Sequence, residues 1–156
     1  MAHLKFRMDV PLVPQARNSS CWYASACMVS YYREAGPRLG LPQVWQENNG
    51  ISLAEESALA RNEGLVAWPL PKSKNFSEAD VYAALKQAGP LWAGGDWDGD
   101  GMHVVVLTGI EGGKIYYNDP WPVDKGRKND SRPISWLNKW LDWKDSNALL
   151  YRPATI

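Results

Sequence analysis

Four polar residues of this 156-residue chain, Gln15, Cys21, His103 and Asp119, have the types and the order that thiol chemistry requires. A free cysteine has a pKa of about 8.5, so only a few per cent of it is the reactive thiolate at neutral pH. A nucleophilic cysteine therefore needs groups that stabilise its anion and a base that moves protons. With only two cysteines and two histidines, the chain has few ways to supply them.

Cys21 stands at the start of a segment that predicts a helix. Residues 22–34 are rich in Ala, Met, Val and Tyr, which is typical of a mostly buried helix, and the Asn-Ser-Ser stretch at 18–20 supplies N-cap residue types. Cys21 would lie in the first turn, where unpaired backbone N–H groups and the positive end of the helix dipole favour a thiolate. The Cys21 N–H can also point at an oxyanion, and the side-chain amide of Gln15 is a candidate for the second donor.

A packing role is the alternative for Cys21, because a free cysteine is usually a small buried hydrophobe. Cys27 lies on a different face of the predicted helix and too far along it for a disulfide with Cys21, so we expect it in the core. Two cysteines in all exclude a disulfide scaffold and a four-cysteine zinc site.

His103 is the candidate base, because the other histidine, His3, lies in a terminal tail. An apolar run at 104–110 predicts a central strand, and a Glu-Gly-Gly turn leads from it to a partner strand at 114–118. The base would then lie at a strand end. The alternative is that His103 is a core histidine with satisfied hydrogen bonds.

The returning strand brings Asn118 and Asp119 back toward His103, where one of them can hold the imidazole through its second ring nitrogen. We assign this orienting role to Asp119. Strand alternation leaves Asn118 open, because Pro120 bends the chain at this point. The alternative is that these residues only end a strand.

A wider pattern, spread over the chain from about residue 10 to 151, surrounds these residues. Its parts are Gln15, the pair Cys21-Trp22, His103 before an apolar strand, and Asp119-Pro120-Trp121 after the next strand. This combination resembles papain-like cysteine peptidases, and more narrowly their compact bacterial members, which include secreted effector proteases. The stretch from His103 to Asp119 is similar also to bacteriocin-leader peptidase domains.

The resemblance implies an α+β fold in which an N-terminal helical part carrying Cys21 packs on an antiparallel sheet carrying His103 and Asp119. It implies Cys21 as nucleophile, His103 as base and acid, Asp119 as orienting residue and Gln15 as oxyanion donor. Many papain-like enzymes have Asn at the place of Asp119, whereas the compact bacterial members have Asp.

Two tryptophans next to these residues are candidates for substrate binding. Trp22 follows the nucleophile, and Trp121 comes two residues after Asp119, where it could also cover the His103 and Asp119 pair from water. An ordinary place in the core is the alternative for Trp121.

The expected function is hydrolysis of peptide bonds through a Cys-His-Asp triad and an acyl thioester, with no cofactor or metal. An amidase, a deamidase or another acyl-transfer toxin, such as one directed at peptidoglycan, would use the same triad. A non-catalytic papain-like binding module is the third alternative. A peptide or protein substrate is the implied partner, and an inhibitor or immunity protein is left open.

Composition supports one domain over 1–156 with a core at about 10–152. The chain is 45% hydrophobic and has nine tryptophans, which is enough for an adequate core. Its 17 basic and 17 acidic residues cancel, so electrostatics favours neither nucleic acid nor an anionic membrane as a partner. Apolar runs are too short to span a bilayer, and the N-terminus resembles no signal peptide. We therefore expect a cytoplasmic protein or one exported by a signal-independent route.

Other segments predict the remaining elements. Ser52 and Ser77 predict the starts of two helices that end at Gly64 and Gly89, and 91–94 predicts a short strand. A terminal helix at 135–143 and a strand at 148–151 complete the expected order of helices first and then a sheet. The terminal helix carries its three tryptophans at helical spacing, which indicates core packing: Trp136, Trp140 and Trp143.

The stretch 96–101, Asp-Trp-Asp-Gly-Asp-Gly, reproduces the first half of a calcium-binding loop. The second half fails, because the position that needs a bidentate Glu is Leu107 and a strand follows in place of a helix. We interpret the stretch as a polar loop whose carboxylates favour the protonated form of His103.

Overall fold

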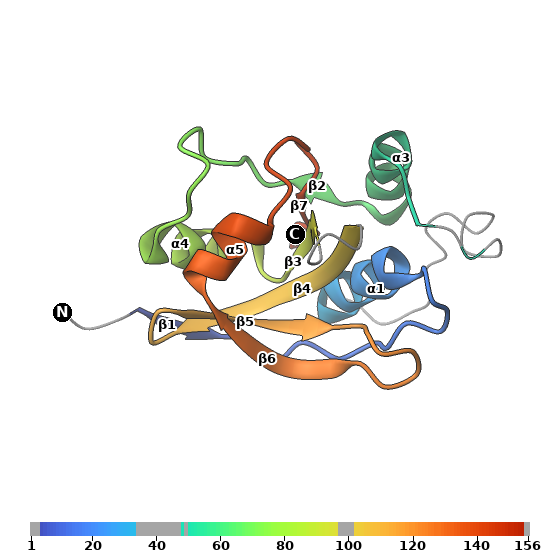
Figure 1. Cartoon of the computed structure of the whole chain (residues 1–156), viewed down its shortest axis with the longest axis horizontal. Helices are drawn as coiled ribbons and strands as arrows, with labels where there is room; N and C mark the ends of the chain where they lie inside the picture. Colours follow the sequence, from blue (N-terminus) through green and yellow to red (C-terminus); the bar gives the residue numbers. More distant parts are fainter. Residues whose placement is uncertain (1–3, 34–47, 49, 97–101, 155–156) are drawn as a thin grey trace.

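A computed structural model of the chain describes residues 4–33, 48, 50–96 and 102–154, and over these residues its centre is an antiparallel sheet of seven strands (Figure 1). The sheet order is β2-β7-β3-β4-β5-β6, and β1 pairs with the end of β4 that β3 does not reach. The strands are β1 (Lys5–Arg7), β2 (Val66–Ala67), β3 (Leu91–Asp96), β4 (Met102–Glu111), β5 (Lys114–Asp119), β6 (Arg127–Pro133) and β7 (Leu149–Tyr151).

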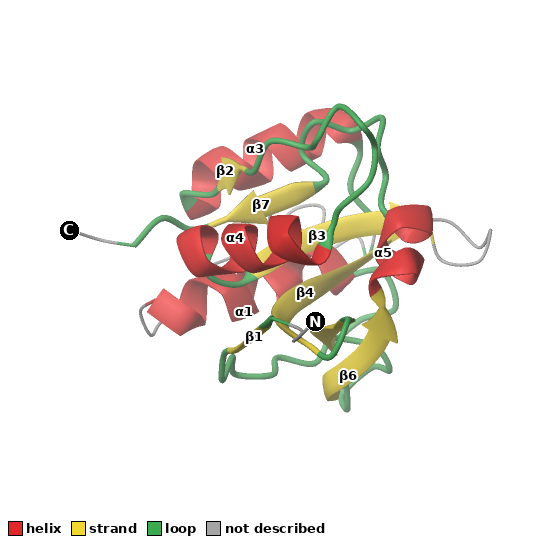
Figure 2. Ribbon diagram, turned by 90° about the vertical axis from the view of Figure 1, so that its left-hand side faces the viewer, coloured by secondary structure: helices red, strands yellow, loops and turns green. Residues whose placement is uncertain are grey.

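Helices pack against this sheet. Those of the described residues are α1 (Cys21–Arg33), α3 (Leu53–Glu63), α4 (Glu78–Ala88) and α5 (Ile134–Trp140). Both α1 and α4 contact β4, and Figure 2 shows α4 in front of the sheet and α1 behind it. Every residue of β4 from Val104 to Ile110 is buried, as expected for a strand covered on both faces. The α+β class predicted from the sequence is confirmed.

Local sequence signals explain where two of the helices begin and end. Ser52 and Ser77 each form a capping box, in which the serine hydroxyl accepts a hydrogen bond from the third residue of the helix and that residue's carboxylate accepts one from the serine N–H. Gly64 ends α3 in the left-handed conformation that glycine adopts without strain, and Gly89 ends α4. These boundaries agree with the predictions.

The C-terminal helix is shorter than predicted. It ends at Trp140 because Leu141 takes an extended conformation and forms an isolated bridge with Gly95 of β3. Gly95 allows this approach, since a Cβ atom there would overlap both the ring and the backbone oxygen of Trp140. The expected order of helices first and then a sheet was also wrong, because β1 and β2 precede α4.

One hydrophobic core lies between the sheet and the helices. Cys27 is in it with 2% of its surface exposed, as predicted, and neither cysteine forms a disulfide. The prediction that the tryptophans of the C-terminal segment pack in the core is confirmed for Trp140, whereas Trp136 and Trp143 are partly buried against it. Trp136 stacks on Trp140 and on Tyr117 of β5.

None of the helices in the described ranges has the length and apolar content that crossing a bilayer requires.

Candidate active site

Cys21 is the first residue of α1 and is partly exposed. The carbonyl of the preceding residue, Ser20, accepts hydrogen bonds from the N–H groups of Tyr23 and Ala24, which starts the helix at this point. The backbone N–H groups of a first helical turn have no partner within the helix and carry its positive dipole end. The position favours negative charge on the Cys21 sulfur.

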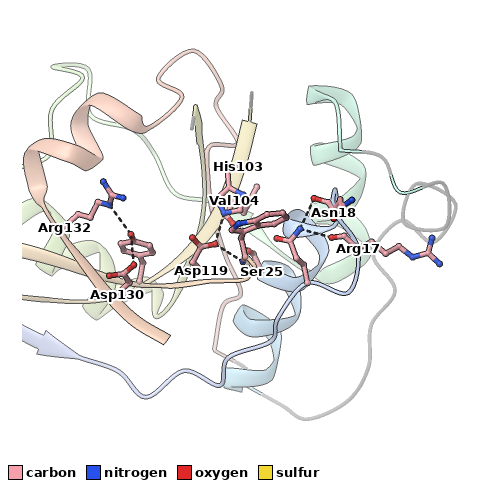
Figure 3. Close-up of polar contacts among 11 residues, drawn as sticks. Arg17, Asn18, Ser25, His103, Val104, Asp119, Asp130 and Arg132 are labelled. Atoms are coloured by element: carbon pink, nitrogen blue, oxygen red, sulfur yellow. Dashed lines mark hydrogen bonds and ion pairs between the residues drawn. The ribbon is translucent and has the colours of Figure 1, made fainter. Parts of the chain in front are cut away.

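Two buried hydrogen bonds hold this end of α1 against the sheet. The Ser25 hydroxyl donates to the backbone oxygen of Val104, the residue after His103, at 3.3 Å (Figure 3). The indole N–H of Trp92 in β3 donates to the backbone oxygen of Trp22 at 3.0 Å. The helix that carries Cys21 is thus joined to the strands beside His103.

His103 and Asp119 meet because β4 and β5 form a hairpin that returns the chain to the same end of the sheet. The Nε2 atom of His103 lies 2.7 Å from Oδ1 of Asp119 (Figure 3). The side chain of Asp119 is 1% exposed and that of His103 is 14% exposed. Because Asp119 takes Nε2, the Nδ1 atom is the one left to face a third group.

Cys21 lies near enough to the His103 side chain to affect its pKa. Burial lowers the pKa of His103, but the hydrogen bonds and negative charges of Asp119 and Cys21 outweigh it and raise the pKa to about 9. His103 is therefore an imidazolium at neutral pH. The structure brings together the three side chains that the sequence pattern singled out.

Asn118 points elsewhere and is fully buried. Its Nδ2 atom donates to the backbone oxygen of Val10 at 2.9 Å, and its Oδ1 atom accepts from the N–H of Asn129 at 3.0 Å. Neighbouring strand residues point to opposite faces, so only one of Asn118 and Asp119 can reach His103. Asp119 is the residue that contacts His103.

Gln15 is 1% exposed, and its Nε2 atom donates to the backbone oxygens of Arg17 at 2.8 Å and Asn18 at 2.9 Å. Both carbonyls accept from the same amide nitrogen. Turning the amide over would place its oxygen against two carbonyl oxygens, which fixes the orientation. The oxyanion role that the family resemblance implied for Gln15 stays a prediction.

The two candidate tryptophans lie in different surroundings. The Trp22 side chain is 1% exposed within the core, which leaves no surface for a substrate, so its prediction as a binding residue is corrected to a packing role. Trp121 is 41% exposed, which excludes the core alternative, and its backbone N–H donates to Asp119 Oδ1 at 2.9 Å. Met102, next to His103, is 50% exposed. Sequence reasoning missed Met102, because an apolar residue at a strand start carries no signal of exposure.

No group of three or more His, Cys, Asp or Glu side chains within the described ranges could hold a metal ion. Of the calcium-like stretch, only Asp96, the last residue of β3, lies within those ranges. His3 also lies outside them.

The chain belongs to a family of papain-like cysteine proteases, because the family model described as papain-like cysteine protease AvrRpt2 matches residues 4–138. A double glycine motif protease from an AMS/PCAT transporter, crystallised in complex with the leader peptide, is 25% identical, with a TM-score of 0.60 over 96% of this chain and 94% of its own. A protein described as a C39-like peptidase from Bacillus anthracis has a TM-score of 0.67 at 14% identity, over 98% of this chain and 100% of its own, and shares the fold. The protein is therefore a compact papain-like cysteine peptidase.

Proposed function

We propose that this peptidase hydrolyses peptide bonds through a triad of Cys21, His103 and Asp119 and a covalent thioester. The observation that supports this most is the position of the His103 imidazole, which has Asp119 Oδ1 at 2.7 Å from Nε2 and lies near enough to Cys21 for that residue to raise its pKa. A nucleophile, a base and an orienting group in contact are the arrangement that nucleophilic catalysis needs.

Acylation begins with attack of the Cys21 thiolate on the carbonyl carbon of the substrate, which moves an electron pair onto the carbonyl oxygen. The Cys21 N–H at the start of α1 donates to this oxyanion. When the oxyanion collapses, the C–N bond breaks and the His103 imidazolium gives its proton to the leaving amine. The products of this step are a free amine, an acyl thioester on Cys21 and a neutral His103.

Deacylation returns the proton. Neutral His103 takes a proton from water while the water oxygen attacks the thioester carbon. Collapse breaks the C–S bond, releases the carboxylic acid and restores the Cys21 thiolate beside the His103 imidazolium. Asp119 stays in contact with Nε2 throughout and stabilises the charged imidazole.

The substrate in this proposal is a peptide or protein. The similar transporter protease was crystallised with a leader peptide. In the present chain Trp121 lies two residues after Asp119, and Met102 lies directly before His103. Both side chains are exposed and offer apolar surface, and we assign them to substrate contact. The proposal includes action as a secreted bacterial effector, which is a role of the compact peptidases that the sequence resembles.

A peptide library incubated with the wild-type protein tests this function, with Cys21→Ala as the inactive variant and Cys27→Ala as the matched control. We expect new product masses from the wild type and from Cys27→Ala, and none from Cys21→Ala. Purified peptidoglycan in a parallel incubation separates peptidase from cross-link hydrolase. Full activity of Cys21→Ala, or products from peptidoglycan alone, would contradict the proposal.

Thiol labelling gives a second readout that needs no substrate. The Cys27 side chain is 2% exposed, and burial raises its pKa. Cys21, by contrast, is partly exposed and lies near a cationic histidine. We expect iodoacetamide to modify Cys21 first. Equal rates at both cysteines would mean that Cys21 is not an activated thiol.

A further inference from the structure

We propose that Trp140, the last residue of α5, is a positioning residue for His103. Its indole ring forms a wall beside the imidazole and limits where His103 can lie relative to Asp119 and Cys21. The inference rests on the proposed function, because it concerns the histidine that the proposed mechanism uses. Trp140 itself touches neither the substrate nor the reacting atoms.

The place of the Trp140 ring is set by Gly95 of β3. A Cβ atom on Gly95 would overlap Cδ2 and Cε2, the two fused carbons of the indole, so the ring occupies the space that a side chain at this position would take. The backbone after Trp140 is joined to the same strand. Leu141 forms a bridge with Gly95, and the N–H of Asp142 donates to the backbone oxygen of Gly94 at 3.1 Å.

His103 is the residue of β4 that pairs with Gly95. Directly opposite residues of an antiparallel pair point to the same face of the sheet, with their Cβ atoms about 4.5–5.5 Å apart. The indole stands at the Cβ position of Gly95, so it lies beside the first atoms of the His103 side chain. Trp140 is 4% exposed, which makes the β3 side of His103 a dry aromatic surface.

Two more rings continue this wall toward Asp119. Trp136 stacks on Trp140 with ring centroids 4.9 Å apart, and on Tyr117 of β5 with centroids 5.4 Å apart. Because Trp140 stands over β3 and Tyr117 belongs to β5, the ring of Trp136 between them crosses β4. Tyr117 is two residues before Asp119 and points to the same face of the sheet. Burial raises the pKa of Tyr117, and the negative charges of Asp130 and Asp119 raise it further, so this ring lies within electrostatic reach of the orienting carboxylate.

β6 holds the other end of this row of rings. The Tyr117 hydroxyl donates to Oδ2 of Asp130 at 3.4 Å and accepts from Nε of Arg132 at 3.2 Å (Figure 3). The guanidinium carbon of Arg132 lies 5.1 Å from the centroid of the Trp136 ring. Backbone pairing at Gly95 fixes one end of the row and side chains of β6 fix the other, so the rings restrict the imidazole beside them.

Stacking, more than hydrogen bonding, holds the Trp140 ring. Its indole N–H is buried and has no hydrogen-bond partner within the described part of the chain. Packing over Gly95 and stacking on Trp136 are therefore the contacts that set its place. Phenylalanine keeps an aromatic ring without the N–H, so Trp140→Phe should preserve most of the wall, whereas Trp140→Leu should remove it.

Nuclear magnetic resonance of the imidazole tests the contact without a substrate. An indole beside His103 shifts the Cδ2–H and Cε1–H resonances of the imidazole through its ring current, and His3 is the only other histidine to be assigned. We expect Trp140→Leu to move the His103 resonances and Trp140→Phe to move them less. Water should also exchange faster with the His103 ring proton that faces Asp119 in Trp140→Leu.

Kinetics tests the positioning role. In Trp140→Leu we expect kcat on a peptide to fall by about tenfold or more, because small misplacements of reacting groups have effects of this order. KM should stay near the wild-type value, since Trp140 makes no substrate contact in this proposal. Alkylation of Cys21 by iodoacetamide should slow as well. Trp140→Phe should recover most of kcat.

Trp143→Leu is the matched control. Trp143 follows α5 and is also packed against the core, but its ring lies against Phe76 with centroids 5.5 Å apart, and its indole N–H donates to the backbone oxygen of Asn138 at 2.8 Å. We expect Trp143→Leu to lower the melting temperature and to leave kcat and the His103 resonances unchanged. All rates are measured below the melting temperature of each variant.

Wild-type His103 resonances and kcat in Trp140→Leu would overturn the proposal, and so would equal losses of kcat in Trp140→Leu and Trp140→Phe. If Trp140→Leu does not fold, Trp136→Leu, which removes the stacking partner, must move the His103 resonances and lower kcat. Failure of the proposed function is visible separately. In that case the wild type would not hydrolyse peptides, while the resonances would still report whether the indole lies beside His103.

Discussion

Two buried acids of this molecule have different partners. Asp119, at the end of β5, is 1% exposed and contacts His103. Glu56, in the first turn of α3, is 3% exposed and lies near Asp145, which precedes β7 and is 5% exposed. The depth of burial is nearly the same at the two places.

At these two places the proton is held by different kinds of group, a histidine at one and a carboxylic acid at the other. Burial lowers the pKa of His103, but hydrogen bonds and negative charge from Asp119 and Cys21 raise it to about 9. Burial raises the pKa of Glu56, and the hydrogen bond and charge of Asp145, with the charge of Asp142, bring it to about 9. At neutral pH the proton at one place is on His103, beside the Asp119 carboxylate, and at the other place it is on Glu56.

The difference shows that the partner, more than burial, decides what a buried acid does here. Beside a histidine, the carboxylate of Asp119 stabilises a cation near Cys21. Beside a second carboxyl group, Glu56 keeps its proton at neutral pH. Substitutions that change the partner but not the burial can test this difference.

The largest effect is expected from Asp119→Ala. Without the carboxylate, His103 loses both its orientation and the charge that stabilises its protonated form. We expect kcat/KM on a peptide to fall by about 100-fold or more. Steady-state kinetics on a fluorogenic peptide measures it.

Asn118→Ala is the control for this substitution. Asn118 directly precedes Asp119 and is also buried, but its side chain forms hydrogen bonds with the backbones of Val10 and Asn129. We expect it to lower the free energy of unfolding by about 1–3 kcal/mol and to keep most of the activity. A greater loss of activity from Asn118→Ala than from Asp119→Ala would reassign the orienting role.

The next effect is the pH dependence of the wild-type enzyme. The pKa of folded His103 is raised from 6.5 to about 9, so the imidazolium persists above the usual range and is lost as the pH rises through about 9. We expect kcat/KM to fall about tenfold per pH unit above that value. Asp119→Asn, which keeps the hydrogen-bonding shape without the charge, should move this alkaline limb to lower pH. An unmoved limb would show that the charge of Asp119 does not stabilise the imidazolium.

The smallest effect on activity is expected from Glu56→Gln, which changes stability. The folded protein holds a proton on Glu56 between pH 4.5 and about 9, whereas the unfolded chain releases it above 4.5. This contribution to stability is fully present below pH 4.5 and is lost as the pH rises through about 9. Its slope is at most about 1.4 kcal/mol per pH unit.

The glutamine side chain of that variant has no proton to lose, so the variant's free energy of unfolding should depend less on pH and exceed that of the wild type at pH 8.5. Urea denaturation at pH 5 and pH 8.5 measures both, and unchanged kcat/KM serves as the control. The same pH slope in both proteins would show that Glu56 is ionised in the folded state.

The sequence predicted those parts that local signals determine. Serine and glycine at helix ends place α3 and α4, because capping is a contact between near neighbours. The apolar run after His103 and the Gly-Gly turn predict the hairpin of β4 and β5, and this hairpin already places Asp119 near His103. Residue order and strand pairing were therefore enough to predict that the histidine and the carboxylate lie close together.

Contacts between distant segments could not be predicted. β6 has a polar sequence without alternation, and it is a strand because β5 offers it an edge. The side chain of Trp22 is buried by packing that only the folded core creates. The amide of Gln15 turns to Arg17 and Asn18 because of a loop shape that no residue spacing reveals.

The hairpin of β4 and β5 also has a consequence for biosynthesis. Cys21 leaves the ribosome well before His103 and Asp119, because they stand far later in the chain. A nascent chain therefore carries Cys21 before His103 and Asp119 have been added. Packing of α1, which begins at Cys21, against β4 joins segments far apart in the chain and is a non-local event in folding. The proposed triad therefore cannot assemble until synthesis has passed residue 119.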